Sequence, residues 1–481
     1  MKVVLVHPAG SNWIPGQKDV TTAANRMVPI GLLSMAAYLE KSGHEALVYD
    51  CLGPNAPNDF NRNVKAIAAL NPDMIGFTAT TSSFLDAYKM AEALKKISAN
   101  VKNVFGGIHA SSMGGRLLNR FTDIDYLCLG EGEETICELA DGVSPKNITG
   151  LAWRDGEEIK NNPPRLNLKS LDDLPFPAYE KLSGFPRGYR LPPFSYINIP
   201  GTNISTSRGC IYQCSYCDRS VFKRGFRSNS AQYIYEHMKM LSHRFGIRHI
   251  NIYDDLFTMN RRRITKLCTL LAQEPLGLHF NCAIHAGHVD DDLLTMLKDA
   301  GCLMISVGIE SGDPVLLERH KTSVSLEQVS EVVAKIQAKD IRAKGLFMMG
   351  LPGETRQSVF KTSDYIISLG LDDMNMTKFT PFPGAPCWSG INDEGVFDEN
   401  WPLMNCLNFV YVPEAFKSAN ELDELYNYHV KRFYSDKKWR KKFRRRMWQH
   451  RHTLWYFIKN VVPLLKAKRH FEPKSKLKRR L

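Results

Sequence analysis

Three cysteines stand close together between Ser205 and Asp218, at Cys210, Cys214 and Cys217. They follow a predicted strand with the spacing C-x3-C-x2-C, so the three sulfurs belong to one loop. Three thiolates can hold one face of a cubic iron–sulfur cluster and leave its fourth iron without a protein ligand. Structural zinc normally has four ligands, and the loop has no nearby fourth Cys or His. The loop therefore predicts a cluster with an open iron.

The other cysteines indicate a reduced protein. The chain has 11 cysteines in 481 residues, too few for a disulfide scaffold. Cys51, Cys128, Cys268 and Cys302 lie in apolar stretches and are typical of small buried side chains. The first residues, MKVVLVHPAG, run into a predicted strand without the pattern of a secretory signal. We expect a cytoplasmic protein.

With Tyr216 before the last cysteine, the loop is similar to the cluster loop of the radical S-adenosylmethionine (SAM) superfamily, and the similarity extends to Pro381–Ala385. The resemblance implies a [4Fe–4S] cluster held by the three cysteines, with Tyr216 beside the bound SAM. The open iron binds the amino and carboxylate groups of SAM. An electron, from a flavodoxin- or ferredoxin-type donor, then splits SAM into methionine and a 5′-deoxyadenosyl radical that abstracts hydrogen from an unactivated carbon.

The resemblance also implies SAM contacts at later strand ends. Asp254 and Asp255 follow the predicted strand Ile250–Tyr253, where carboxylates suit the amino group of SAM. The alternative is that one of them only caps the helix entered near Asn260.

Glu310 and Ser311 follow the predicted strand Ile305–Ile309 and are expected at the ribose or the methionine carboxylate, and Gly350 is expected beside the adenine. His285 stands where many relatives carry Arg, so it could face substrate or be a structural histidine.

The first 145 residues alternate short apolar runs with helical patterns, which is typical of a parallel sheet covered by helices. This order predicts a Rossmann- or flavodoxin-like domain, in which ligands bind beyond the carboxyl ends of the strands. The predicted helix is Pro29–Ser42, and the predicted strands are Lys2–His7, Ala46–Tyr49, Met74–Phe77, Asn103–Phe105 and Tyr126–Leu129.

Small and hydroxyl-bearing residues after these strands would admit a large ligand with phosphate and amide groups, although the glycines could be simple turns. A dinucleotide fits less well, because no G-x-G-x-x-G follows the first strand. The segments GFTATTS, FGGIHAS and LGEGEET resemble the cobalamin-binding domain attached to one class of radical SAM enzymes, without the D-x-H-x-x-G loop whose His coordinates cobalt in other cobalamin proteins. The implied cobalamin contacts are Thr78, Thr80, Ser82, Gly106, Gly107, His109, Gly130, Glu131 and Gly132.

The predicted fold is α/β throughout. Residues 1–145 form the Rossmann- or flavodoxin-like cobalamin-binding domain, and the Pro-rich residues 146–198 form a linker with a small hairpin around Leu151–Ile159. Residues 199–390 form a partial (β/α)6 radical SAM barrel, and residues 391–481 form a helical region with a basic amphipathic tail.

The positive charge is concentrated in this tail. The net charge is +13, yet residues 431–481 alone carry 20 Lys or Arg against 2 Asp or Glu. The apolar stretch in Met447–Lys466 is short for a membrane span of about 20 residues. A basic helix with aromatic residues suits an anionic membrane surface, which would place the enzyme on the inner face of the membrane.

Two other interpretations of the tail remain. It could be a helix docked on the barrel with a solvated basic face, or it could follow a nucleic-acid backbone. Methylthiolating radical enzymes that modify transfer RNA carry a different N-terminal domain and a C-terminal RNA-binding barrel, and neither pattern occurs in this sequence. We do not expect a nucleic-acid partner.

The resemblance leaves two chemistries open. In the first, methylcobalamin supplies a methyl group to a carbon radical of a hydrophobic substrate. In the second, the radical begins an oxidation or ring closure, as in the anaerobic cyclase that acts on the tetrapyrrole magnesium-protoporphyrin IX monomethyl ester. A third alternative is a non-catalytic corrinoid-binding protein, against which the intact Cys210, Cys214 and Cys217 argue.

Overall fold

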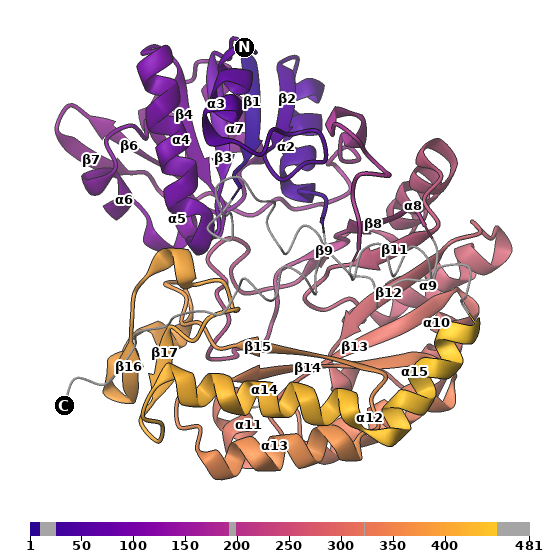
Figure 1. Cartoon of the computed structure of the whole chain (residues 1–481). Helices are drawn as coiled ribbons and strands as arrows, with labels where there is room; N and C mark the ends of the chain where they lie inside the picture. The colour runs from indigo at the N-terminus through magenta and orange to yellow at the C-terminus, as the bar shows by residue number, and fades with distance from the viewer. Residues whose placement is uncertain (10–25, 192–198, 322, 450–481) are drawn as a thin grey trace. The chain divides into compact units, whose positions relative to one another are not determined.

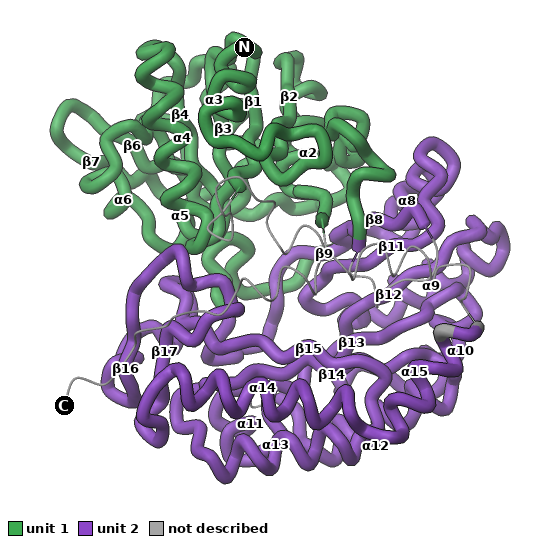
Figure 2. The backbone as a smooth tube through the Cα atoms, in the orientation of Figure 1, with its two compact units in different colours: residues 1–190, 218–228 green, residues 191–217, 229–481 purple. Residues whose placement is uncertain are grey.

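The computed structural model describes residues 1–9, 26–191, 199–321 and 323–449 (Figure 1). The chain divides into two compact units (Figure 2). The first unit comprises residues 1–190 and 218–228, and the second comprises the remaining residues. The segment that directly follows the cysteine loop thus belongs to the first unit.

The first unit is built on a sheet of seven strands in the order β2-β1-β3-β4-β5-β6-β7. The first five of these strands run parallel, and the β6–β7 hairpin extends the sheet in antiparallel fashion. The strands are β1 Lys2–His7, β2 Glu45–Asp50, β3 Met74–Thr78, β4 Lys102–Gly106, β5 Tyr126–Cys128, β6 Leu151–Asp155 and β7 Glu158–Asn161.

Both faces of this sheet are covered by helices, because successive side chains of β1 are buried on opposite sides. On one face, Val3 and Leu5 pack with α2 (Ile30–Lys41) and α7 (Glu133–Ala140). On the other, Phe105 stacks on Phe77 and meets Phe84 of α4 (Phe84–Ile97) edge to face. The smaller helices are α3 Phe60–Ala68, α5 Ile108–Met113 and α6 Arg116–Arg120.

The second unit contains a curved, six-stranded parallel sheet in the order β15-β14-β13-β12-β11-β8. This partial barrel and the Rossmann-like sheet confirm the predicted α/β class. The strands are β8 Gly201–Ile204, β11 His249–Ile252, β12 His279–Ile284, β13 Cys302–Glu310, β14 Arg342–Met349 and β15 Asp373–Lys378. The helices are α8 Ala231–Phe245, α9 Arg261–Gln273, α10 Asp291–Asp299, α11 Pro314–His320, α12 Leu326–Ala338 and α13 Arg356–Ser368.

Polar residues fix where the helices of the barrel begin. In each case a side-chain oxygen before the helix accepts a hydrogen bond from a backbone N–H of its first turn, which satisfies a donor that the helix leaves free. The capping residues are Ser230, Asn260, Asp290, Asp313, Ser325 and Thr355. Since Asn260 caps α9, neither Asp254 nor Asp255 is needed for that purpose.

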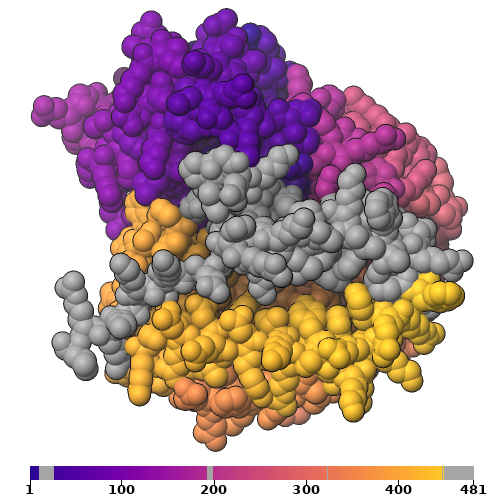
Figure 3. Space-filling view, in the orientation of Figure 1, coloured from indigo at the N-terminus to yellow at the C-terminus, as the bar shows by residue number. Residues whose placement is uncertain are grey.

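The chain continues through the hairpin of β16 (Gly395–Phe397) and β17 (Tyr411–Pro413) to α14 (Ala419–Ser435), which packs along α13. The last described helix is α15, Lys437–Gln449. The two C-terminal helices form part of one surface of the second unit, drawn in yellow in Figure 3. Two further short strands, β9 (Ser207–Arg208) and β10 (Arg227–Ser228), lie on either side of the cysteine loop in the sequence.

Part of the basic tail is docked. Lys442 and Arg446 of α15 both pair with the buried carboxylate of Asp372, and the indole N–H of Trp439 donates to the Asp372 carbonyl oxygen at 3.1 Å. Residues 450–481, which hold most of the predicted apolar stretch, lie outside the described residues. Among the helices the structure describes, none has the length and apolar character needed to cross a bilayer.

Replacing Phe105 by Ala should lower the free energy of unfolding of the first unit by about 3 to 5 kcal/mol, because it removes a fully buried ring from an aromatic cluster. The midpoint of urea unfolding measures this loss. Leu166→Ala is the control, since Leu166 is 86% exposed and its truncation should change stability by less than about 0.5 kcal/mol. Equal losses in the two variants would contradict the described core.

Candidate functional site

The cysteine loop is tied to the second unit through Ser215. The Ser215 N–H donates to the His320 carbonyl oxygen at 3.1 Å, and its hydroxyl lies 2.7 Å from Nδ1 of His320. Cys210, Cys214 and Cys217 are half-buried cysteines of this loop. No three His, Cys, Asp or Glu side chains of the described residues are gathered at metal-binding distance. The three cysteines fit an iron–sulfur cluster for two other reasons. Thiolates are the usual ligands of such clusters, and the anchored loop offers no fourth ligand.

Tyr216 connects this loop with the end of β13. Its hydroxyl interacts with Glu310 and Cys214; burial first, and then the charge of Glu310, raises the pKa of Tyr216 far above its ordinary value. Glu310 also pairs with Lys321, with 3.0 Å between Oε1 and Nζ. A Cβ atom on Gly308 would lie 2.7 Å from the same Nζ, so the lack of a side chain at Gly308 leaves room for the Lys321 ammonium group at this position.

Asp254 and Asp255 lie next to each other at the end of β11 but in different surroundings. The carboxylate of Asp254 is fully buried and accepts hydrogen bonds from the N–H groups of Thr206 and Ser207, at 2.6 and 3.1 Å, and from the Thr206 hydroxyl. Asp255 is exposed at the surface. Neighbouring protein atoms still remove part of the water around its carboxylate, and this desolvation, followed by the charge of Asp254, raises the pKa of Asp255. Of the two predicted SAM contacts, Asp255 is the one with a carboxylate left open to a ligand.

His285 belongs to a ring cluster beside the cysteine loop. Its ring stacks on Tyr212 at 4.2 Å between centroids, and the Tyr212 hydroxyl lies 2.8 Å from Nε2 of His288. The N–H of Gly287 donates to Nδ1 of His285, and burial, followed by the charges of His288 and Lys321, lowers the pKa of His285 to about 4. A neutral imidazole cannot supply the positive charge that an arginine would provide at this position.

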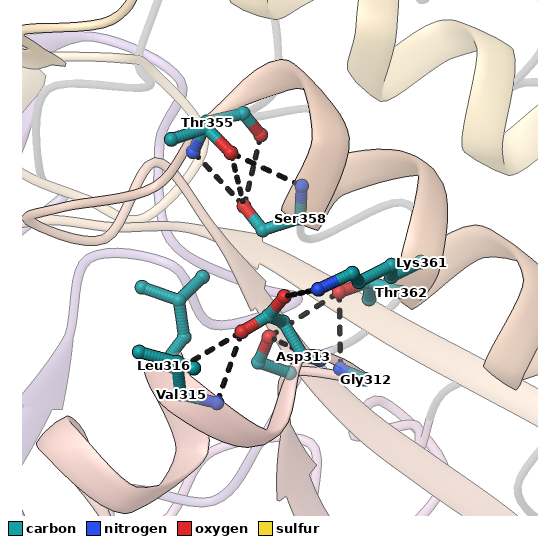
Figure 4. A network of polar contacts seen from close by, with 9 residues as sticks. Gly312, Asp313, Val315, Leu316, Thr355, Ser358, Lys361 and Thr362 are labelled. Carbon is teal, nitrogen blue, oxygen red and sulfur yellow. Dashed lines mark hydrogen bonds and ion pairs between the residues drawn. The ribbon is translucent and has the colours of Figure 1, made fainter.

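Ser311 joins the end of β13 to α13. It is 1% exposed, its hydroxyl lies 3.2 Å from that of Thr362, and it accepts a hydrogen bond from the Asp313 N–H at 3.1 Å. Figure 4 shows the neighbouring bonds, from the Gly312 N–H to Thr362 and from Lys361 to Asp313. The hydroxyl of Ser311 is thus engaged within the protein.

Gly350 directly follows β14, has a φ of +92° and donates its N–H to the carboxyl group of Glu354. Glu354 is 2% exposed, and this burial raises its pKa to about 8, with a smaller contribution from the charge of Asp313. The turn that the resemblance places beside adenine is therefore held by a buried carboxyl group.

In the first unit, Thr78, Thr80 and Ser82 come together at the end of β3. They line a cavity of roughly 360 Å³, together with His7 and Ile108. Hydroxyl groups around such a cavity suit the amide and phosphate groups of a corrinoid. Three of the predicted cobalamin contacts are thus gathered at one place.

The predicted glycines form the neighbouring turns. Gly106 ends β4, and Gly107 has a φ of +89°, where a Cβ atom would lie 3.0 Å from Oγ1 of Thr78. Gly130 and Gly132 occupy the turn between β5 and α7. The turn at Gly107 needs glycine and keeps the backbone close to Thr78.

His109 and Glu131 lie elsewhere. His109 is fully buried, with Nδ1 3.1 Å from the Thr81 hydroxyl, and burial lowers its pKa to about 4. The buried carboxylate of Glu131 forms a bidentate ion pair with Arg227, at 2.9 and 3.0 Å. Both side chains serve the packing of the first unit, so the structure does not bring them to the cavity.

Several residues of the site are missing from the sequence-based prediction. Lys321 follows α11 without any motif, and Arg263 belongs to a run of three arginines that is typical of an exposed helix start. Yet the side chain of Arg263 is 3% exposed and donates to the carbonyl oxygen of Thr206 at 2.9 Å. No local pattern could have indicated these contacts.

Comparisons with known proteins agree with this geometry. Residues 204–366 match the radical SAM superfamily, and residues 16–140 match the B12 binding domain. An uncharacterized methyltransferase of Pyrococcus horikoshii is 30% identical over 87% of this chain and 89% of its own length. The chain belongs to the radical SAM superfamily. It is an enzyme of the group that carries a B12-binding domain, and its cofactors are a [4Fe–4S] cluster, SAM and cobalamin.

Two further matches are more distant. The anaerobic magnesium-protoporphyrin IX monomethyl ester cyclase of Cereibacter sphaeroides is 25% identical over 91% of this chain and 71% of its own. Among solved structures, the radical SAM methyltransferase TsrM of Kitasatospora setae shares the fold, with a TM-score of 0.63 at 20% identity over 82% of this chain and 75% of that one.

The buried carboxyl group of Glu354 predicts a pH dependence of stability. Its pKa is 4.5 in an unfolded chain and about 8 in the folded enzyme, so folding favours the protonated form. Stability should therefore fall as the pH rises between these values, by at most about 1.4 kcal/mol per pH unit. Glu354→Gln should remove this slope in urea unfolding measured across the range. The exposed Glu318→Gln should retain it, and a slope that persists in Glu354→Gln would contradict the assignment.

Proposed function

We propose that this radical SAM enzyme is a cobalamin-dependent methyltransferase that methylates an unactivated carbon of a hydrophobic substrate. The observation that carries the proposal is the 30% identity to the methyltransferase of Pyrococcus horikoshii over nearly the full length of both chains. A second relative, the cytidylyl-2-hydroxyethylphosphonate methyltransferase of Streptomyces wedmorensis, is 24% identical over 80% of each chain. Cytidylyl-2-hydroxyethylphosphonate is a polar compound, so the hydrophobic substrate proposed for this chain does not follow from that relative.

The cluster belongs to Cys210, Cys214 and Cys217, whose thiols lie on an anchored loop. SAM belongs beside them, with its amino group at the exposed Asp255 and its polar atoms near Tyr216 and Glu310. The support for this assignment is that Tyr216 already joins the loop to the end of β13. Asp254 acts as a positioning residue, because its carboxylate already accepts hydrogen bonds from the backbone N–H groups just before the loop.

On the first unit, cobalamin belongs at the cavity formed by Thr78, Thr80 and Ser82 and at the turns of Gly106, Gly107, Gly130 and Gly132. When bound, the cluster and SAM supply an organic radical, and cobalamin supplies the methyl group. The protein holds these groups in place.

The stoichiometry of such a methylation is fixed by mass balance. One SAM gives up its methyl group and leaves as S-adenosylhomocysteine. A second SAM accepts an electron and leaves as methionine and 5′-deoxyadenosine, which carries the hydrogen atom taken from the substrate carbon. Two electrons enter per turnover from a flavodoxin- or ferredoxin-type donor.

The alternative is an oxidative ring closure of a tetrapyrrole, which the 25% identity to the magnesium-protoporphyrin cyclase favours. That chemistry uses the radical but transfers no methyl group. It therefore produces 5′-deoxyadenosine and methionine without S-adenosylhomocysteine, and the products distinguish the two candidates even before a substrate is known.

Anaerobic enzyme loaded with iron, sulfide and cobalamin should, with a low-potential reductant and SAM alone, form S-adenosylhomocysteine as well as 5′-deoxyadenosine. Mass spectrometry with methyl-deuterated SAM measures both products and the label on the corrinoid. Cys214→Ser should lower 5′-deoxyadenosine to background, because the cluster loses a ligand. Cys406→Ser, at another half-buried cysteine, should leave it unchanged. Absence of S-adenosylhomocysteine would contradict the methyltransferase and favour the cyclase.

The proposed partner of the basic tail is an anionic membrane surface, reached from the cytoplasm. Lys441, Arg444 and Arg445 are exposed on α15, whereas Lys442 and Arg446 are paired with Asp372. The free charge of α15 is thus smaller than the sequence suggests. A hydrophobic substrate dissolved in the membrane would give such a surface contact a purpose.

Replacing Lys441, Arg444 and Arg445 by Gln should weaken binding to phosphatidylglycerol-containing vesicles roughly a hundredfold, since each of the three cations contributes about 1 kcal/mol. Vesicle co-sedimentation measures the effect. The matched control replaces Lys96, Lys146 and Lys169, which are exposed on the first unit, and should bind like the unaltered enzyme. Equal binding to neutral vesicles, or binding to RNA in preference to vesicles, would overturn the membrane assignment.

A further inference from the structure

Three consecutive residues at the C-terminal end of α11 lie against different parts of the candidate site. Lys321 pairs with Glu310 at the end of β13. Arg319 lies beside the turn after β14, because a Cβ atom on Gly353 would be 2.5 Å from its guanidinium group. Between them is His320, which is 4% exposed. The function proposed above gives this buried imidazole no role.

The two ring nitrogens of His320 contact two segments that are far apart in the sequence. Nδ1 lies 2.7 Å from the hydroxyl oxygen of Ser215, which stands between the second and third cysteines of the loop. Nε2 lies 2.8 Å from the carbonyl oxygen of Pro352, in the turn after β14. The imidazole therefore bridges the cysteine loop and this turn.

These contacts determine the tautomer of His320. A carbonyl oxygen only accepts hydrogen bonds, so Nε2 carries the proton that faces Pro352. Nδ1 then has the lone pair of the neutral ring, and the Ser215 hydroxyl donates to it. Burial lowers the pKa of His320, against a smaller opposite effect of the hydrogen bond to Pro352, so the ring is neutral. With both nitrogens bonded inside the protein, His320 acts only through the segments it joins.

The backbone of Ser215 is fixed as well. Its N–H donates to the carbonyl oxygen of His320 at 3.1 Å, and its own carbonyl oxygen accepts a hydrogen bond from the Cys387 N–H at 2.9 Å. Two of the polar groups of Ser215 are thus bonded to His320. Because Ser215 lies directly between Cys214 and Tyr216, the placement of both neighbours depends on the end of α11.

The turn after β14 is held from its other side by Glu354. The carboxyl group of Glu354 accepts a hydrogen bond from the Gly350 N–H, and the Glu354 N–H donates to the Leu351 carbonyl oxygen at 3.0 Å. In a parallel β/α barrel, ligands bind at the loops that follow the carboxyl ends of the strands, and this turn is one of those loops. His320 therefore connects the loop of the cluster cysteines to a loop in the ligand-binding position of the barrel.

We infer that His320 is a positioning residue for SAM, which holds the cysteine loop and the turn after β14 at one fixed separation. SAM has to contact the cluster and the strand ends at the same time, so its affinity depends on that separation. The inference goes beyond the proposed methyl transfer, because SAM binds to the cluster in the alternative ring closure as well.

The test is electron paramagnetic resonance of the reduced cluster in the full-length enzyme, reconstituted anaerobically, while SAM is added. SAM that binds to the open iron changes the spectrum, so the titration gives a Kd. His320→Ala should keep its iron content but raise this Kd roughly tenfold, as expected for the loss of one or two neutral hydrogen bonds. The matched control is His429→Ala on α14, which removes an imidazole that is 2% exposed and should leave the Kd unchanged.

A double-mutant cycle distinguishes positioning from general destabilisation. Ser215→Ala should also raise the Kd, and the double variant should bind SAM no more weakly than His320→Ala alone, since the two side chains act through one hydrogen bond. An unchanged Kd in His320→Ala, additive losses in the double variant, or an equal loss in His429→Ala would overturn the inference. If His320→Ala does not retain the cluster, Ser215→Ala decides, because it removes only a hydroxyl group, and an unchanged Kd in that variant would reject the role of His320.

Discussion

The buried carboxylate of Asp254 determines where the cysteine loop begins. It binds the backbone N–H groups of Thr206 and Ser207, just before the loop, and lies 3.8 Å from the guanidinium of Arg263. Arg263 in turn donates to the carbonyl oxygen of Thr206. Asp254 therefore binds the backbone N–H groups of this short segment, and Arg263 binds its carbonyl oxygen. Breaking a buried pair of this kind costs about 3 to 5 kcal/mol, because the remaining charge has no water to replace its partner. The position of Cys210 therefore depends on the contacts of Asp254 and Arg263, in which no cysteine takes part.

Around this anchor, some polar groups have their hydrogen-bond partners within the protein, and others are open to solvent. Asp254 and Ser311 have their polar atoms bonded within the protein, whereas Asp255 is exposed. Glu310 has a left-handed backbone with φ of +69°, an arrangement that costs a non-glycine residue about 1 to 3 kcal/mol. Its pairing with Lys321 holds it there. Strain at the end of β13 is compatible with a strand end shaped for a ligand rather than for stability.

The sequence predicts most of the architecture because its signals are local. Alternating apolar runs indicate the parallel strands, and the spacing of three cysteines indicates the cluster loop without knowledge of any distant residue. The contacts that decide which side chains are available are not local. Glu131 follows a strand like a ligand residue, but Arg227, nearly a hundred positions later, pairs with it. His109 follows a glycine turn, yet its ring lies among Thr81 and Phe84 in the core.

The same reasoning applies to the positive charge of the tail. By composition, residues 431–481 are a basic appendage available to any anionic partner. In the folded enzyme, Asp372 at the start of β15 takes up both Lys442 and Arg446, and the ring of Trp439 packs beside them on Tyr434. These cations neutralise a buried carboxylate and fasten α15 to the barrel. Such internal ion pairs determine how much of the positive charge of the tail is available to a partner. This amount follows from the fold and cannot be obtained by counting residues.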